Sequence, residues 1–146
     1  MEESQELINK SEKIKLDFKD VKYATGRRKT SIAKVWLKKG TGKIKVNGKN
    51  YDSYFKRENH KMQLLRPFEL TKQNLNYDVK CNVKGGGMTG QVGAMVLGIS
   101  KALLLFDSEL KPILKKEKLT TRDSRSVERK KYGHRKARRS FQFSKR

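Results

Sequence analysis

Positive charge is concentrated in the last quarter of this sequence, and that concentration limits how much of the chain can fold by itself. Residues 111–146 contain 15 Lys or Arg against 3 Asp or Glu, whereas residues 21–110 contain 18 against 6 and residues 1–20 contain 4 against 6. A segment with a high net charge and few apolar residues cannot bury enough surface to offset the entropy of folding. We therefore predict three parts: a disordered acidic extension (1–20), a globular domain (21–114) and an extended basic tail (115–146).

The whole chain carries a formal charge of +22 in 146 residues, with a pI near 10.3, and therefore favours a polyanionic partner. Nucleic acid is the first candidate and an anionic membrane the second. No stretch approaches 18 uncharged apolar residues, and the most apolar segment, 88–106, contains Lys101, so no membrane-spanning helix is expected. The acidic N-terminus resembles neither a secretory signal nor a transit peptide, which predicts that the chain acts where it is made.

The predicted globular domain contains alternating apolar residues, which are typical of half-buried strands. They fall in three groups: Ala33, Val35 and Leu37; Ile44 and Val46; and Tyr77, Val79, Cys81 and Val83. Asn47-Gly48, directly after the second group, is a dipeptide preferred in tight hairpin turns because both positions tolerate positive φ. A hairpin or meander is expected there, and the third group is the clearest strand of the sequence.

Two helices are predicted from their boundary residues. One begins at Asp52 or Ser53, either of which can cap it, and runs to about Leu65, because the Arg66-Pro67 pair disfavours continued helical geometry. A shorter one begins at Asp107 or Ser108, with Pro112 near its first turn. Its inward-facing residues are expected to be Leu110, Ile113 and Leu114.

Three glycines separate the clearest strand from a third, longer helix. That helix has one apolar stripe, made of Val92, Met95, Val96, Ile99, Ala102, Leu103 and Phe106. Gly85-x-Gly87-x-x-Gly90 matches the dinucleotide-binding fingerprint, but only 62 residues follow Lys84, too few and too cationic for a doubly wound sheet. Two alternatives stay open for the glycines: a phosphate-binding turn at a helix N-terminus, or a turn packed against another element.

Single residues of reactive types show no catalytic pattern. Cys81, the one cysteine, alternates with the apolar face of its strand and is expected to fill the core of a protein in a reducing compartment. His60 and His134 have no partners at metal-ligand spacing, so surface or RNA-stacking roles are favoured. Trp36 falls between Lys34 and Lys38, where it either stacks on a base or packs under a loop. We expect no enzyme activity, metal or cofactor.

The basic segments contain motifs that resemble a known family. In order, the motifs are Thr25-Gly26-Arg27-Arg28-Lys29, Val83-Lys84-Gly85-Gly86-Gly87, Val127-Glu128-Arg129-Lys130-Lys131-Tyr132-Gly133 and Gln142-Phe143-Ser144-Lys145-Arg146. Together they resemble the bacterial-type small-subunit ribosomal protein S-nine family (the universal ribosomal protein uS-nine family). The resemblance covers about residues 22–146, and residues 1–20 are expected to lie outside it.

The resemblance implies both a fold and partners. The fold is α+β, a small and mainly four-stranded sheet with helices packed on it, similar to domain two of ribosomal protein S-five, with an extended basic C-terminal tail. The partners are small-subunit rRNA, peptidyl-site tRNA and neighbouring proteins of the subunit head, with no membrane and no small-molecule substrate. The location is a cytoplasmic ribosome, or the ribosome of an organelle that encodes the protein.

Charge and resemblance together predict the binding residues. Arginines fork onto phosphates, and Tyr132, Phe141 and Phe143 interleave aromatic faces with the tail's cations. The residues expected to bind rRNA are Arg27, Arg28, Lys29, Lys84, Arg129, Lys130, Lys131, Arg135, Lys136, Arg138 and Arg139. The resemblance alone implies that Ser144, Lys145 and Arg146 contact tRNA. Phe141 stands where the family usually has proline, which makes the tail's approach less rigid.

Overall fold

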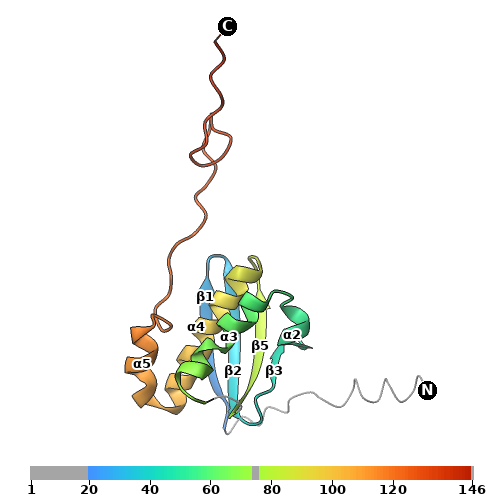
Figure 1. Cartoon of the computed structure of the whole chain (residues 1–146), viewed down its shortest axis with the longest axis vertical. Coiled ribbons are helices and arrows are strands. Elements are labelled where there is room, and N and C mark those ends of the chain that lie inside the picture. Colours follow the sequence, from blue (N-terminus) through green and yellow to red (C-terminus); the bar gives the residue numbers. More distant parts are fainter. Residues whose placement is uncertain (1–19, 74–75, 146) are drawn as a thin grey trace, which may run out of the picture.

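The computed structural model describes residues 20–73 and 76–145, which contain one sheet, the helices packed on it and a long C-terminal tail (Figure 1). The sheet has five strands in the order β1-β2-β5-β3-β4. Their bounds are β1 Lys22–Arg28, β2 Ser31–Lys39, β3 Ile44–Val46, β4 Lys49–Asn50 and β5 Tyr77–Lys84. All neighbours are antiparallel except β3 and β5, which are parallel. The fold is therefore α+β. The sheet has one strand more than the four expected, and its edge strand β4 is only two residues long.

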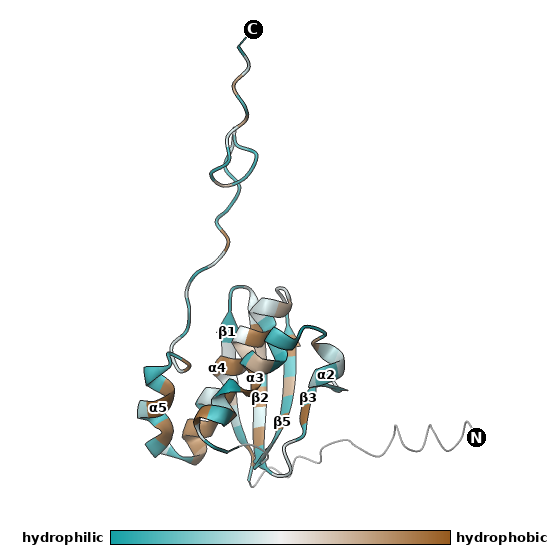
Figure 2. Ribbon diagram, in the orientation of Figure 1, coloured by the Kyte–Doolittle hydropathy of each residue, from teal (hydrophilic) through white to brown (hydrophobic). Residues whose placement is uncertain are grey.

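Two long helices, α3 Glu58–Leu70 and α4 Met88–Phe106, cover one face of this sheet. The shorter elements lie beside them: α2 Tyr51–Tyr54 next to β3 and β4, and the 3₁₀ turn η1 Ser108–Leu110 followed by α5 Lys111–Lys116 beyond the end of α4. Figure 1 shows α4 and α3 crossing the same face, and α4 packs chiefly against β1, β2 and α3. The core lies between these layers and is apolar, as the brown segments of α4 in Figure 2 illustrate. The opposite face of the sheet has no helix over it in the part of the chain that the structure describes.

Several predicted elements are confirmed with close bounds. The alternating residues from Tyr77 to Lys84 form β5, and the helix after the glycines is α4. Asn47-Gly48 forms the β3–β4 hairpin turn, with φ of 50° at Asn47 and 84° at Gly48. Asp107 caps η1, since its side chain accepts a hydrogen bond from the backbone N–H of Glu109. Long, regular periodicity and local turn chemistry are therefore visible in the sequence.

Two helix predictions are wrong in part. The helix expected from Asp52 to Leu65 is broken into α2 and α3, and α3 continues through Pro67 to Leu70. Proline removes one helical hydrogen bond and its ring crowds the preceding turn, but Pro67 is fully buried in the core, and its packing there offsets the cost. Ile113 was expected to face inward, but it is 44% exposed, while Leu110 and Leu114 of the same segment are buried.

Helix α4 is long and apolar enough to cross a membrane by length and composition, contrary to the expectation drawn from Lys101. It lies in the interior of the domain, where 56% of its most apolar window is buried. A core helix between a sheet and a second helix meets the same criteria as a membrane span, because both are hydrophobic on most sides. Its packing against β1, β2 and α3 accounts for its composition.

Candidate nucleic-acid interface

The two glycine-containing basic motifs meet at one end of the sheet. The β1–β2 turn carries Lys29, and Ser31 at the start of β2 donates a hydrogen bond from its hydroxyl to the carbonyl of Gly85, 3.0 Å away. A Cβ at Gly86 would lie 2.1 Å from that hydroxyl oxygen, and Gly85 has a φ of 73°. Gly85 and Gly86 therefore form a turn packed against β2, one of the two alternatives left open for them.

The dinucleotide interpretation fails in this fold. Strand β5 precedes the glycines, but its neighbours are antiparallel β2 and the short parallel β3, so no doubly wound parallel sheet is formed. Gly87 is the N-cap of α4 and has a φ of −107°, and a Cβ there would meet nothing within 4 Å among the described residues. Packing does not require glycine at that position.

Arg28 binds the tail of its own chain. Its Nη1 donates to the carbonyl oxygen of Arg125 at 2.7 Å and, more weakly, to that of Asp123 at 3.4 Å. Its Nη2 forms an ion pair with the Asp123 carboxylate at 2.9 Å, and the Arg28 side chain is only 20% exposed. Its stem lies over α4 at Gly93, where a Cβ would come within 2.9 Å of Arg28 Cγ. Arg28 therefore clamps the tail to the end of the sheet.

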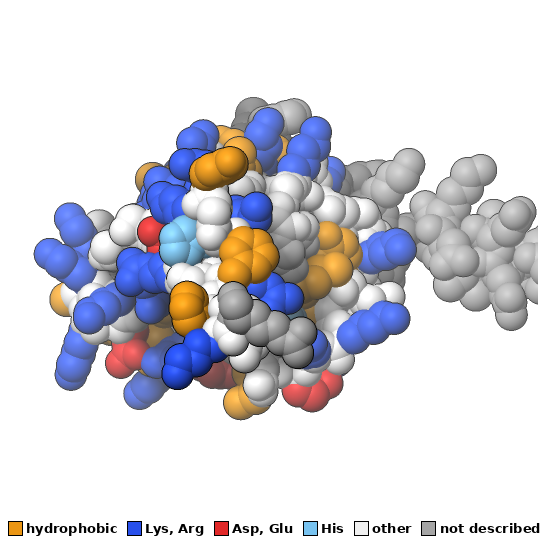
Figure 3. Space-filling view, turned by 90° about the horizontal axis from the view of Figure 1, so that it is seen from above, with side chains coloured by type: hydrophobic (Ala, Val, Ile, Leu, Met, Phe, Trp, Pro, Cys, Tyr) orange, Lys and Arg blue, Asp and Glu red, His pale blue; other side chains and the backbone are white. Residues whose placement is uncertain are grey.

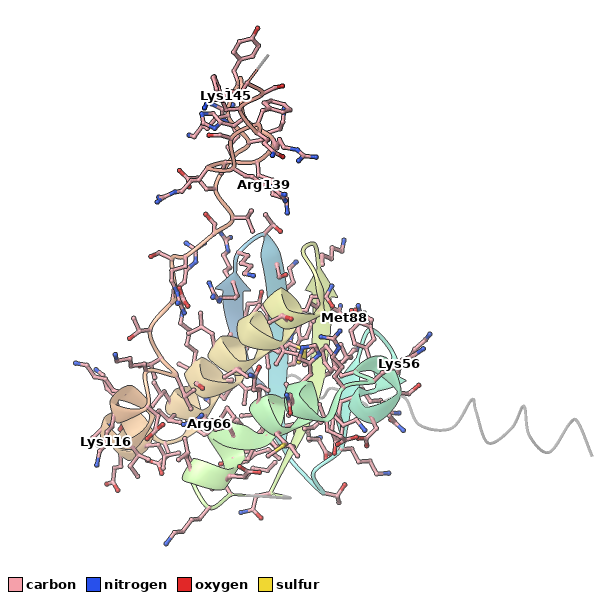
Figure 4. The ribbon with its side chains drawn as sticks, turned by 45° about the horizontal axis from the view of Figure 1, so that its top comes forward. Lys56, Arg66, Met88, Lys116, Arg139 and Lys145 are labelled. Atoms are coloured by element: carbon pink, nitrogen blue, oxygen red, sulfur yellow. The ribbon has the colours of Figure 1, made fainter. Side chains whose placement is uncertain are left out.

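All three acidic residues of the tail region are paired. The pairs are Glu117 with Arg66 of α3 at 2.5 Å, Asp123 with Arg28 and Arg125 at 2.9 Å each, and Glu128 with Arg138 at 2.9 Å. The first two join the tail to the domain, and Figure 4 shows Arg66 and Lys116 on neighbouring helices where the tail begins. Hydrogen bonds from the side chain and backbone of Arg125, together with the Arg28 charge, lower the pKa of Asp123 to about 2.

Beyond residue 126 the tail runs away from the domain and then closes a loop (Figure 1). The backbone N–H of Arg135 donates to the carbonyl of Arg139 at 2.7 Å, that of His134 donates to Lys131 at 3.3 Å, and Gly133 has a φ of 71°. The ion pair between Arg138 and Glu128 crosses the base of this loop. The predicted tail is therefore extended on both sides of a compact basic loop, which charge density alone did not indicate.

The predicted binding residues occupy three places. Arg27 and Lys84 lie on the uncovered face of the sheet and Lys29 in the β1–β2 turn, all exposed. The predicted residues of the tail are all exposed: Arg129, Lys130, Lys131, Arg135, Lys136, Arg138, Arg139, Ser144 and Lys145. Arg146 lies outside the described residues. Viewed from the side where the tail leaves, Lys and Arg side chains are spread over most of the molecule, with a smaller number of acidic ones, mainly toward the lower margin (Figure 3).

The tail presents its aromatic side chains to solvent. Tyr132 and Phe143 are almost wholly exposed, and Phe141 is about two-thirds exposed. Figure 4 shows the two basic positions Arg139 and Lys145 in this part of the tail, far from the domain. Exposed rings among cations are suited to stacking on nucleic-acid bases while the cations contact phosphates.

The cysteine and the first histidine of the chain are buried in the domain. Cys81 is fully buried, and desolvation raises the pKa of its thiol, so it fills the core as expected. His60 is buried between Phe55, with ring centroids 6.1 Å apart, and Thr89, whose hydroxyl oxygen lies 3.3 Å from Nε2. Across residues 20–73 and 76–145, no group of three His, Cys, Asp or Glu side chains is arranged to hold a metal ion.

Comparisons with known proteins identify close relatives. The family model described as ribosomal protein S9/S16 matches residues 26–146. Small ribosomal subunit protein uS9 of Rickettsia canadensis (strain McKiel) is 53% identical over 143 residues, which cover 98% of this chain and 89% of the relative. The protein of that name from Rickettsia felis (strain ATCC VR-1525 / URRWXCal2) is 56% identical over 139 residues, 95% and 86% of the two chains. The family model leaves residues 1–20 unmatched, as expected, although the alignment with the Rickettsia canadensis protein includes most of them.

Proposed function

The chain belongs to the ribosomal protein S9/S16 family and is a non-enzymatic constituent of the small ribosomal subunit, and we propose that its basic surfaces bind rRNA while its tail reaches peptidyl-site tRNA. The observation that supports this most directly is the pairing of acidic residues in the tail. Because Glu117, Asp123 and Glu128 are already engaged with cations of the same chain, the remaining tail cations act as an uncompensated positive surface.

Phosphate contacts supply the affinity in this proposal. Lys and Arg release counterions from the RNA backbone when they neutralise phosphates, and the affinity then falls with increasing salt. The basic loop, residues 131–139, holds Arg135, Lys136 and Arg139 on a turn closed by its own backbone, so fewer conformations are lost when it binds. RNA shape, read across the domain and the loop together, determines where the protein binds.

The test replaces three loop cations by neutral residues of similar length. For the variant Arg135→Gln/Lys136→Gln/Arg139→Gln, the slope of log K against log salt should be smaller by roughly 2 to 3, at about 0.7 to 0.9 per lost phosphate contact. The matched control is Lys72→Gln/Lys101→Gln/Lys111→Gln, which removes the same charge from exposed positions of the domain. If both variants bind a small-subunit rRNA fragment with the same slope, the loop does not anchor the protein.

The tip of the tail is proposed to contact tRNA in the peptidyl site. The tail is clamped at Asp123 and directed away from the domain, so its last residues can reach a partner that the domain does not touch. Ser144 and Lys145 lie at the far end of the described tail, followed by Arg146. Charge-assisted hydrogen bonds from two such exposed cations to phosphates should together contribute about 1 to 3 kcal/mol.

Removal of Lys145 and Arg146 tests the tip. Small subunits assembled with the truncated protein should sediment normally but hold peptidyl-site tRNA about five- to a hundredfold more weakly, which is the equivalent of roughly 1 to 3 kcal/mol. The control variant, Lys72→Gln/Lys101→Gln, removes two exposed charges from the domain instead and should leave tRNA affinity unchanged. Equal tRNA affinity in subunits with the full and truncated chains would contradict a tRNA contact.

The remaining partners follow from the same assignment. We propose neighbouring proteins of the subunit head as further contacts. The two relatives named above come from bacteria of the genus Rickettsia, which supports a cytoplasmic ribosome over that of an organelle. Tagged full-length protein should co-sediment with small subunits in a moderate-salt gradient. Recovery with DNA instead would indicate a nucleic-acid-binding role outside the ribosome.

A further inference from the structure

The face of the sheet that carries no helix has an ordered arrangement of side chains. Antiparallel pairing places Tyr23 opposite Trp36 and Trp36 opposite Lys80, so these three form one row across β1, β2 and β5. The next row is Thr25, Lys34 and Asn82, and the third is Arg27, Ile32 and Lys84. Each of these residues alternates with a buried one on its strand, so all nine point away from the core.

The aromatic pair of the first row has a defined geometry. The ring centroids of Tyr23 and Trp36 are 5.3 Å apart, with their planes tilted by 44°. The hydroxyl of Thr25 donates to the Tyr23 hydroxyl oxygen at 3.0 Å, which fixes the tyrosine ring along β1. Tyr23 is 45% exposed and Trp36 is half-buried. Among the described residues no helix covers the face on which Trp36 lies, and its ring packs against Tyr23.

Charge on this face is positive. Arg27, Lys34 and Lys84 are exposed and Lys80 is half-buried. The acidic residue on the outward side of β5, Asp78, accepts hydrogen bonds at 2.9 Å from the backbone N–H groups of Thr41 and Lys43, which directs its carboxylate toward the β2–β3 connection. Among the described residues, the four cations therefore surround the aromatic pair and Ile32 without a carboxylate between them.

We propose that this uncovered sheet face binds unpaired RNA nucleotides, with a base stacked on the Tyr23–Trp36 pair and the backbone phosphates held by Lys34, Lys80 and Lys84. Cations select a polyanion, and exposed rings on a flat surface select bases that are free of a duplex. The amide of Asn82, within the middle row, can hydrogen-bond to a base edge. An RNA duplex cannot stack on these rings, because its bases are already stacked and paired with one another.

This inference deepens the proposed rRNA binding and rests on it, but it concerns a surface separate from the tail. Trp36 is the only tryptophan of the chain, so its fluorescence reports on this face alone. Full-length protein, excited where tyrosine does not absorb, should show strong quenching when titrated with a short oligouridylate. An RNA duplex of equal length should bind, as followed by the anisotropy of labelled RNA, but should quench much less.

Variants separate stacking from charge. Trp36→Leu should weaken binding of the labelled single strand about tenfold, and Trp36→Phe, which keeps a ring, should weaken it much less. Lys34→Ala should weaken it more than Lys101→Ala, which removes an equal charge from the exposed side of α4. The fluorescence experiment uses the unaltered chain, and the phenylalanine variant retains packing against Tyr23, so a folding defect in the leucine variant does not remove the test.

Three outcomes would overturn the proposal. They are no quenching while the anisotropy shows saturated binding, equal quenching by the duplex or by heparin, and quenching by poly-glutamate, which would mark a surface for an acidic protein. These outcomes differ from failure of the proposed function. In that failure, the loop variant with Arg135, Lys136 and Arg139 replaced would bind rRNA with an unchanged salt slope, whatever Trp36 reports.

Discussion

Single acidic residues in the tail determine where its cations lie. The Asp123 carboxylate accepts hydrogen bonds from the backbone N–H and the guanidinium of Arg125, and it also forms an ion pair with Arg28 of the β1–β2 hairpin. Glu128 holds Arg138 at the base of the basic loop. Charge density predicted a basic tail but not these pairings, because Arg28 and Asp123 are 95 residues apart in sequence. The clamp is therefore a property of the folded chain.

The Asp123 carboxylate should titrate well below an ordinary aspartate. Its pKa is lowered from 3.8 to about 2, mainly by Arg125 and secondarily by Arg28. A carboxyl group whose pKa is lowered in the folded state stabilises that state when the pH is above its ordinary pKa. The stabilisation is lost as the pH falls to the lowered pKa. The clamp should therefore persist at pH 4 and open near pH 2. Carboxyl-carbon NMR should show the midpoint rising more in Arg125→Ala than in Arg28→Ala, and a midpoint near 3.8 in the unaltered chain would contradict the pairing.

Gly26 should tolerate no side chain, in contrast to Gly87. A Cβ at Gly26 would lie 1.8 Å from the carbonyl oxygen of Ala94, whereas one at Gly87 has open space. Because the obstruction is backbone and cannot rotate away, Gly26→Ala should lower the free energy of unfolding by about 3 kcal/mol or prevent folding. Gly87→Ala, at the N-cap of α4, should lower it by about 1 kcal/mol or less. Urea denaturation followed by circular dichroism measures both, and equal stability of the two variants would be inconsistent with the close packing of β1 on α4.

At the scale of elements, the close packing of β1 on α4 explains why β1 was not predicted from the sequence. The inward residues of β1 include Ala24 and Gly26, which are small because α4 lies against them. A strand with small inward residues lacks the alternating apolar signal by which β2 and β5 were predicted. The continuation of α3 through Pro67 was missed for a related reason, since burial of that residue is a tertiary effect. Local patterns predict elements whose own residues supply the core contacts.

The candidate site was likewise predictable only in part. Clusters such as Arg129-Lys130-Lys131 are contiguous in sequence, so charge alone indicated them. The rows on the sheet face combine β1, β2 and β5, and β5 pairs with β2 across an intervening segment that contains α3. No spacing rule connects Lys80 to Tyr23 before the strand order is known. The surface that surrounds Trp36 therefore emerges only with the fold.

Asn47 should stabilise the sheet through its side-chain hydrogen bonds as well as through its turn conformation. Its Oδ1 accepts from the backbone N–H of Val83 at 2.9 Å and its Nδ2 donates to the carbonyl of Val83 at 3.1 Å, so the side chain extends the pairing of β3 with β5. Asn47→Ala should cost about 2 kcal/mol, from two hydrogen bonds and a positive φ.

Asn47→Asp provides the matched comparison, because it keeps the acceptor and the turn preference but loses the donor. Its cost should be intermediate in chemical denaturation at neutral pH. Gly48→Ala, in the same turn with a φ of 84° but no such contacts, should cost about 1 kcal/mol. If Asn47→Ala is no worse than Gly48→Ala, the side-chain bridge to Val83 contributes nothing to the sheet.

At the scale of the whole molecule, self-repulsion should dominate the response to salt. The chain has 37 Lys or Arg against 15 Asp or Glu, and exposed ion pairs such as Arg66–Glu117 contribute only about 0 to 1 kcal/mol each. Raising the ionic strength from about 0.01 M to 0.15 M shortens the Debye length from about 30 Å to about 8 Å. Repulsion between distant cations is then screened, which favours the compact state.

The melting temperature of the full chain should therefore rise over that range, by roughly 4 to 8 °C for each kcal/mol of relieved repulsion. Differential scanning calorimetry measures it, and the chain with Arg135, Lys136 and Arg139 replaced by Gln should show a smaller rise. The loop lies far from the domain (Figure 1), so its share should be the part most completely screened at 0.15 M. A melting temperature that falls with salt would mean that the attractive pairs, including those of Glu117 and Asp123, outweigh the excess of positive charge.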